Sequence, residues 1–175
     1  MASGYRNKSR CRRQRDDSGQ ALIEFALSAT ILLTLLFGLI DFSRAIYARQ
    51  VIANLTGEGS SMASRGTTLP DAAAAVVVAG SPLNLSVHGQ VIVSSVFNNN
   101  GKIQLTGQIS RGAIGATSLI GRVIGGTATV PQAVVPQANQ TIFVTEVFYQ
   151  YRPITPIGSF LTTILPSQLY DVAYY

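Results

Sequence analysis

The sequence has few of the residues that hold small secreted domains together or carry out catalysis. Its 175 residues include one cysteine, Cys11, and one histidine, His88. A single cysteine cannot form a disulfide within the chain, so any folded domain must be held together by the packing of its core. A single histidine has no second histidine or cysteine with which to form a catalytic pair or a metal site. We therefore interpret His88 as a structural residue.

Acidic residues, which serve as metal ligands and as catalytic acids and bases, are also scarce. Beyond residue 50 there are four, scattered along the chain: Glu58, Asp71, Glu146 and Asp171. The same region lacks G-x-S-x-G, a phosphate-binding glycine loop and paired carboxylates. Glu146 falls within a predicted strand, where we expect an arginine to neutralise its charge. The candidates are Arg111, Arg122 and Arg152. These absences predict a protein that is not an enzyme and binds neither a metal nor a cofactor.

Charged residues make up 12% of the sequence, about half of the roughly 25% found in soluble domains. The net charge of +5 suggests nucleic-acid binding at first sight. However, six of the thirteen basic side chains lie within residues 1–19, and the rest of the chain is nearly neutral. Nucleic-acid affinity requires basic groups lined up along a folded face, so the sequence argues against that partner. Low charge is expected instead in a protein buried in a membrane or an assembly.

Residues 21–40 form a long apolar stretch that contains one charge, Glu24. As a helix this stretch is about 30 Å long, which matches the hydrocarbon thickness of a bilayer. It spans only if Glu24 lies near one membrane surface, because the next charge is Asp41. The basic cluster precedes the stretch, so we expect a cytoplasmic N-terminus and an extracytoplasmic remainder. The bulky, charged "GLIDFSRAIY" that follows is unlike a secretory cleavage site.

The carboxylate of Glu24 is costly inside a membrane, where insertion of such a group costs roughly 2.5–3.5 kcal/mol at the centre of the bilayer and less near its ends. No basic residue lies four positions away on the helix. A cut between Gly19 and Gln20 removes this difficulty, because it creates an ammonium at Gln20 that Glu24 of a neighbouring subunit can pair with. Asp41 and Arg44, spaced i, i+3, are expected to pair where the helix leaves the membrane.

A basic leader ending in Gly19, followed by Glu24-Phe25 and an apolar helix, resembles the class III signal of type IV pilins. This resemblance implies that a prepilin peptidase cuts after Gly19 and that Glu24 guides the register between subunits. Glutamate followed by an aromatic residue is typical of the tight-adherence (Tad/Flp) branch. The continuation "LLFGLIDFSRAIY" (35–47) resembles its minor pseudopilins, TadE and TadF. The helix residues expected to pack laterally are Leu22, Phe25, Leu32, Leu36 and Phe37.

The helical pattern continues beyond the membrane to about residue 66. The apolar residues that share one helical face there are Phe42, Ile46, Ile52, Leu55 and Met62. Residues 67–80 predict a second helix, because Thr68 and Asp71 are spaced as a capping box and Gly80 provides a stop.

Three segments further along predict an antiparallel sheet. Residues 90–97 and 102–110 alternate with period two around "NNNG", which predicts a hairpin. Residues 141–151 are apolar on both faces and predict a central strand. The irregular segment 112–140 between them is expected to be functional or poorly ordered. In the tail, the short apolar stretch 157–165 predicts an amphipathic element or a partner contact.

The segments "GGTATVPQ" and "FVTEVFYQYRP" resemble the distal part of TadE-like domains. We thus predict an α+β protein in which a long membrane-spanning helix carries a small antiparallel-sheet domain packed on its distal half. The expected division is a leader (1–19), a transmembrane and extended helix (20–66) and an extracytoplasmic domain (67–175).

The function that this resemblance implies is that of a non-catalytic minor pseudopilin of the bacterial inner membrane, incorporated into a Tad-type pilus or initiating it. Its expected partners are other pilins and pseudopilins, the prepilin peptidase and the pilus inner-membrane platform. Two alternatives remain open. One is a minor pseudopilin of a type II secretion system. The other is an uncleaved, signal-anchored periplasmic binding module whose ligand contacts residues 112–140.

Overall fold

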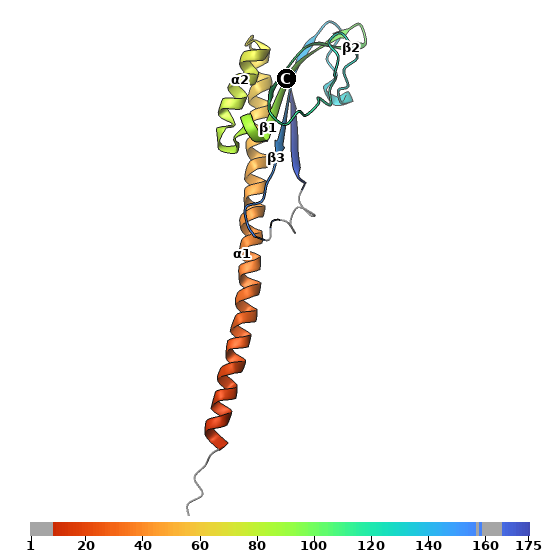
Figure 1. The fold of residues 1–175 in the computed structure, drawn as a ribbon. Coiled ribbons are helices and arrows are strands. Elements are labelled where there is room, and N and C mark those ends of the chain that lie inside the picture. Colours follow the sequence, from red (N-terminus) through yellow and green to blue (C-terminus); the bar gives the residue numbers. More distant parts are fainter. Residues whose placement is uncertain (1–8, 157, 159–165) are drawn as a thin grey trace, which may run out of the picture.

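Helix α1 (Ser9–Ser64) runs without interruption from the N-terminal region into the folded domain. The computed structural model describes the backbone of residues 9–156, 158 and 166–175, with side chains from residue 19 onward. Figure 1 shows the proximal part of α1 projecting alone, while the other elements gather around its distal part. The predicted long helix with an α+β domain on its distal half is therefore confirmed.

The face of α1 that packs on the domain carries small residues, Ala45 and Ala48, at the end nearer the N-terminus. Ala45, Ala48, Ile52 and Leu55 are buried, at spacings of three and four that keep them on one side of the helix. The prediction that Phe42 and Ile46 share this face is wrong, because both are exposed. The alanines allow the end of the sheet to approach the helix closely, and the bulky side chains are turned outward.

Helix α2 (Leu69–Ala79) follows α1 and packs against it. Its N-cap is Thr68, whose hydroxyl accepts a hydrogen bond from the amide of Asp71 at 3.3 Å, and Gly80 forms the C-cap. The predicted helix and its capping residues are confirmed. Two short elements that were not predicted, η1 (Ser81–Leu83) and α3 (Leu85–His88), then lead into the sheet.

The sheet contains four antiparallel strands in the order β2-β1-β3-β4. Their bounds are β1 Gly89–Asn99, β2 Lys102–Gly112, β3 Thr141–Gln150 and β4 Gln168–Tyr174. The predicted hairpin is confirmed, with Asn100 and Gly101 both at positive φ, as a type I′ turn requires. The central position of β3 is also confirmed. Strand β4 was not predicted, and the apolar stretch 157–165 lies almost entirely outside the described residues.

Each face of the sheet is covered by a different layer. On one face Val91, Val93 and Val147 pack with residues of α1 and α2. On the other face Val96, Leu105 and Val144 pack against Ile120 and Ala128 of the segment between β2 and β3. We name residues 113–140 the cover loop. Its one regular element is η2 (Gln132–Val134), yet it forms an ordered second layer over the sheet. This packing explains why β3 is apolar on both faces.

Candidate functional site

The proximal half of α1, residues 19–40, has no partner among the described residues. Its large apolar side chains face outward on all sides: Leu22 is 69% exposed, Phe25 is 72% exposed, and Leu32 and Leu36 are also exposed. Phe37 is partly buried. The helix is long and apolar enough to cross a membrane, and the most apolar part of it has no buried residue. An exposed apolar surface of this size requires lipid or protein around it.

The hydroxyls of two threonines in this half are satisfied within the helix itself. Thr30 Oγ1 donates to the carbonyl of Ala26 at 2.8 Å, and Thr34 Oγ1 donates to the carbonyl of Thr30 at 2.8 Å. Such back-bonding removes the need for water around a hydroxyl in an apolar environment. The hydroxyls of Thr30 and Thr34 are therefore compatible with a hydrocarbon surrounding.

The predicted cleavage and register residues lie together at the start of the described side chains. Gln20 Nε2 donates a hydrogen bond to Glu24 Oε1 at 3.1 Å, one helical turn away. Gly19 has open space around its Cα, and a Cβ added there would meet nothing within 4 Å. Phe25, next to Glu24, is exposed. The side chain that contacts Glu24 thus belongs to Gln20, the residue whose backbone nitrogen would become the new N-terminus after the predicted cut.

Asp41, where α1 leaves the apolar half, is fully buried. Its carboxylate accepts hydrogen bonds from the amides of Ile154 at 3.1 Å and Thr155 at 3.4 Å, and from the hydroxyl of Thr155. The hydroxyl of Tyr151 donates to the carbonyl oxygen of Asp41 at 2.6 Å. We call this set of four residues the Asp41 latch. It ties the chain after β3 to the helix at one level.

The latch changes the interpretation of Asp41. The predicted partner was Arg44, but Arg44 is exposed and the hydrogen bonds come from Ile154 and Thr155. Burial by itself raises the pKa of Asp41, but the hydrogen bonds from Thr155 and Ile154, together with the nearby charge of Arg44, lower it below the usual value. The carboxylate is therefore held in its charged form by the chain after β3.

Glu146, in the middle of β3, is also fully buried. Its carboxylate accepts hydrogen bonds from the hydroxyl of Ser118, from the amide of Leu119 at 2.9 Å and from the hydroxyl of Tyr170 at 3.1 Å. The prediction of an arginine partner is wrong, because the three candidate arginines are all exposed and make no hydrogen bond to this carboxylate. Burial and the charge of Glu146 raise the pKa of Tyr170.

Other polar side chains of the sheet hold the cover loop in the same way. Gln90 Oε1 accepts from the amide of Ala116 at 2.8 Å, and Gln108 Nε2 donates to the carbonyl of Gly121 at 3.1 Å. Further along, Asn98 Nδ2 donates to the carbonyl of Pro136 at 2.7 Å. Polar residues at inward positions of otherwise apolar strands are the sequence signal for this arrangement. The sequence-based prediction did not use that signal.

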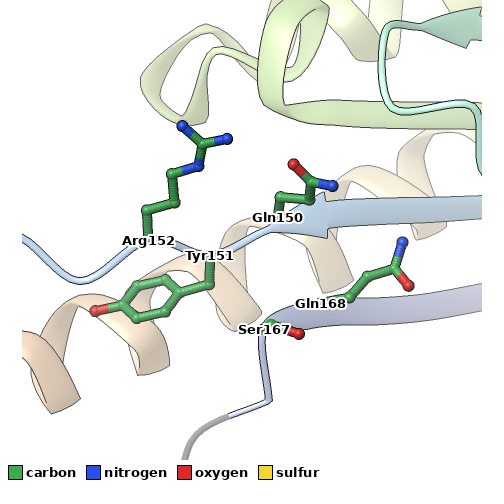
Figure 2. Close-up of a pocket in the computed structure, with 5 residues that line it drawn as sticks. All are labelled: Gln150, Tyr151, Arg152, Ser167 and Gln168. Atoms are coloured by element: carbon green, nitrogen blue, oxygen red, sulfur yellow. The ribbon is translucent and has the colours of Figure 1, made fainter. Parts of the chain in front are cut away.

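A shallow pocket of about 370 Å³ opens where β3 ends and β4 begins. Its lining residues are Gln150, Tyr151, Arg152, Ser167 and Gln168. In Figure 2 the ring of Tyr151 extends along α1, whereas Arg152 extends from the opposite side of the strand. This lining supplies hydrogen-bond donors, but it contains no histidine or carboxylate that could act as a general base for the hydroxyl of Ser167. Among the described residues no three His, Cys, Asp or Glu side chains come together as a metal site. His88 lies at the end of α3, apart from any such group.

Comparison with known proteins gives a match that lies on helix α1. Neither the curated proteins nor the solved structures contain a match to the chain. A match does exist at the level of protein families, and it covers residues 19–61. This range begins at the predicted cleavage glycine and ends within the last turn of α1. Over that helix, the chain matches the family of TadE-like proteins, in agreement with the resemblance to TadE and TadF.

Proposed function

We propose that this chain is a non-catalytic minor pseudopilin of a Tad-type pilus, incorporated into the pilus or acting at its initiation. One observation carries the proposal: the TadE-like match coincides with a helix whose proximal half exposes apolar side chains on all sides. TadE-like proteins are associated with Tad pili, so the proposal assigns this helix to the membrane before assembly and to a bundle of pilin helices after it.

In this proposal the chain spans the bacterial inner membrane once, with the basic leader in the cytoplasm and the sheet domain outside. The prepilin peptidase cuts between Gly19 and Gln20. The new ammonium of Gln20 then pairs with Glu24 of a neighbouring subunit, which fixes the stagger between helices. The contact between the Gln20 side chain and Glu24 supports this role, because it shows that the two residues share one face.

Lateral packing of the helices is assigned to Leu22, Phe25, Leu32, Leu36 and Phe37. The proposed partners are other pilins and pseudopilins, the prepilin peptidase and the inner-membrane platform of the pilus. The chain supplies no chemistry of its own in this scheme. Its contribution is a helix that fits among others and a domain held above it.

The N-terminus of the membrane-extracted protein tests the processing step. Intact mass and terminal peptides are measured in cells with and without the prepilin peptidase. We expect a start at Gln20 that depends on the peptidase. A chain that keeps its leader in cells with active peptidase contradicts the proposal and supports an uncleaved anchor. A cyclised terminal glutamine leaves the processing intact but removes the ammonium, and therefore contradicts the pairing between Gln20 and Glu24.

A matched pair of substitutions tests the role of Glu24 in assembly. Glu24→Ala is expected to stay in the membrane fraction and to be lost from sheared pili, because the register contact is gone. Glu58→Ala changes an exposed acid on the distal half of the same helix and is expected to leave both fractions unchanged. Recovery of Glu24→Ala in pili at the level of the unsubstituted protein contradicts the assigned role.

A further inference from the structure

We propose that the turn after β3, residues 152–155, contacts lipid, and that the side chain of Ile154 inserts into the headgroup region of the leaflet from which α1 emerges. This inference rests on the membrane-spanning part of the proposed function. It adds a second contact with the bilayer, made by the sheet domain at a position far from the helix in sequence. Figure 1 shows the chain after β3 descending beside α1, below the strands.

The position of Ile154 follows from the Asp41 latch. Asp41 is the first residue after the apolar stretch 21–40, so it lies within one residue rise, about 1.5 Å, of the end of that stretch. Its carboxylate is 3.1 Å from the amide of Ile154 and 3.4 Å from the amide of Thr155. The polar layer on each side of a bilayer is roughly 5–7 Å thick. The turn is thus held within this layer whenever residues 21–40 fill the hydrocarbon.

The exposed side chains at this level suit such a layer. Ile154 is 66% exposed, although its own amide donates a partly buried hydrogen bond to Asp41. On α1, Phe42 and Tyr47 are also exposed, and aromatic side chains are favoured where hydrocarbon meets water. Arg44 and Arg152 are exposed nearby in the sequence, and they supply positive charge for lipid phosphates. The occupant is the bilayer itself, because the spanning helix places the turn there.

One exposed apolar residue of the domain, Ile124, lies toward the opposite end of the sheet and serves as a control. Ile124 is 61% exposed and belongs to the cover loop, where the amide of the next residue, Gly125, donates to the carbonyl of Leu105. Leu105 pairs with Val96, and Val96 pairs with Ile142 at the start of β3. Tyr151 of the latch follows the end of that strand, roughly 30 Å away at 3.3 Å per residue. Ile124 is therefore a control of similar exposure that is distant from the membrane.

Tryptophan fluorescence tests the contact directly, since the chain contains no tryptophan. Ile154→Trp, Ile124→Trp and Leu32→Trp are each prepared in the full chain and reconstituted into phosphatidylethanolamine and phosphatidylglycerol vesicles. Quenching is measured with lipids brominated near the headgroup end and with lipids brominated deep in the acyl chains. We expect shallow quenching at Ile154→Trp, several-fold stronger than at Ile124→Trp, and deep quenching at Leu32→Trp.

The three positions separate failure of the inference from failure of the proposed function. Deep quenching at Leu32→Trp with background quenching at Ile154→Trp overturns the lipid contact and leaves the span intact. A blue-shifted but unquenched Ile154→Trp also overturns it, since that result indicates a protein contact. Absence of quenching at Leu32→Trp overturns the membrane span, and the inference falls with it.

Discussion

The two halves of helix α1 place their apolar side chains in opposite ways. From residue 19 to 40 the large side chains other than Phe37 are exposed around the whole circumference. From residue 41 to 64 the exposed apolar residues, such as Phe42 and Ile46, lie opposite a narrow buried stripe. The distal stripe begins with two alanines and contains Gly59 near its end. The distal half, which packs on the domain of the same chain, therefore carries small side chains at this contact. The proximal half, which packs on nothing in the described part of the chain, carries large ones.

Truncating one aliphatic side chain in each half is expected to give the largest difference between the halves in the free energy of unfolding. Ile52 is fully buried against the domain, so Ile52→Ala is expected to lower the free energy of unfolding by about 2–5 kcal/mol. Leu32→Ala removes a side chain of the same size from the exposed half and is expected to leave domain stability unchanged. Denaturant titration in detergent, followed by near-ultraviolet circular dichroism, checks both. Equal destabilisation by the two substitutions contradicts the comparison.

The boundary between the halves is tested by removing the Asp41 carboxylate. Asp41→Ala leaves the amides of Ile154 and Thr155 without an acceptor and is expected to cost about 1–3 kcal/mol. Hydrogen exchange at these two amides is the measurement, and faster exchange is expected there before other parts of the sheet respond. Arg44→Ala is the control and is expected to leave their exchange nearly unchanged. Slow exchange in Asp41→Ala shows that the latch does not hold the turn.

The pH dependence of the latch follows from the lowered pKa of Asp41. Because the folded-state pKa lies below the ordinary value of 3.8, the ionised carboxylate favours the folded chain. This contribution is complete above the ordinary pKa and is lost as the pH falls through the lowered one. Protection of the Ile154 amide should therefore be constant around neutral pH. It should weaken only in acid, and in Asp41→Asn the same acid step should be absent.

The smallest expected effects on stability come from two glycines of the distal half that lie two residues apart, Gly57 and Gly59. A Cβ on Gly59 would lie 2.8 Å from Val76 Cγ2 and 2.9 Å from Thr145 Oγ1, whereas one on Gly57 would meet nothing within 4 Å. Gly57→Ala is expected to stabilise by about 0.5–1 kcal/mol through helix propensity. Gly59→Ala is expected to destabilise by about 1 kcal/mol or more, because overpacking outweighs that gain. Thermal unfolding of the pair checks the sign of each, and stabilisation by both refutes a tight contact at Gly59.

Local patterns predicted those parts of the fold that local chemistry determines. The cap at Thr68, the turn at Asn100 and Gly101, and the two-sided apolar pattern of β3 each depend on residues close in sequence. Strand β4 was missed because its evidence is its pairing with β3. On the buried face of α1, Ile52 and Leu55 were assigned correctly, but Phe42 and Ile46 were not. Two apolar sets share helical spacing near the start of this face, and the shape of the sheet chooses between them.

The hydrogen bonds of the two buried acids, Glu146 and Asp41, depend even more on residues distant in the sequence. Glu146 is bonded to Ser118 and Tyr170, which are 28 and 24 positions away, and Asp41 is bonded to Thr155, 114 positions away. Charge suggested an arginine for Glu146, and charge together with the i, i+3 spacing suggested Arg44 for Asp41. The fold instead supplies hydroxyls and amides, which no spacing rule connects to them. By contrast, Gly19, Glu24 and Phe25 could be proposed as cleavage and register residues from the sequence, because their arrangement is local to one helix.

The continuity of α1 has a mechanical consequence for the domain that it carries. Between Gly19 and Ser64 the helix has 46 residues, roughly 69 Å at 1.5 Å per residue, with no break in its backbone bonding. Such a rod transmits torque, so a rotation of its proximal half about the long axis turns the sheet domain through the same angle. Advancing the contact face by one residue changes this azimuth by about 100°. The side chains that line one half of the rod thereby decide which face of the domain points outward at the other.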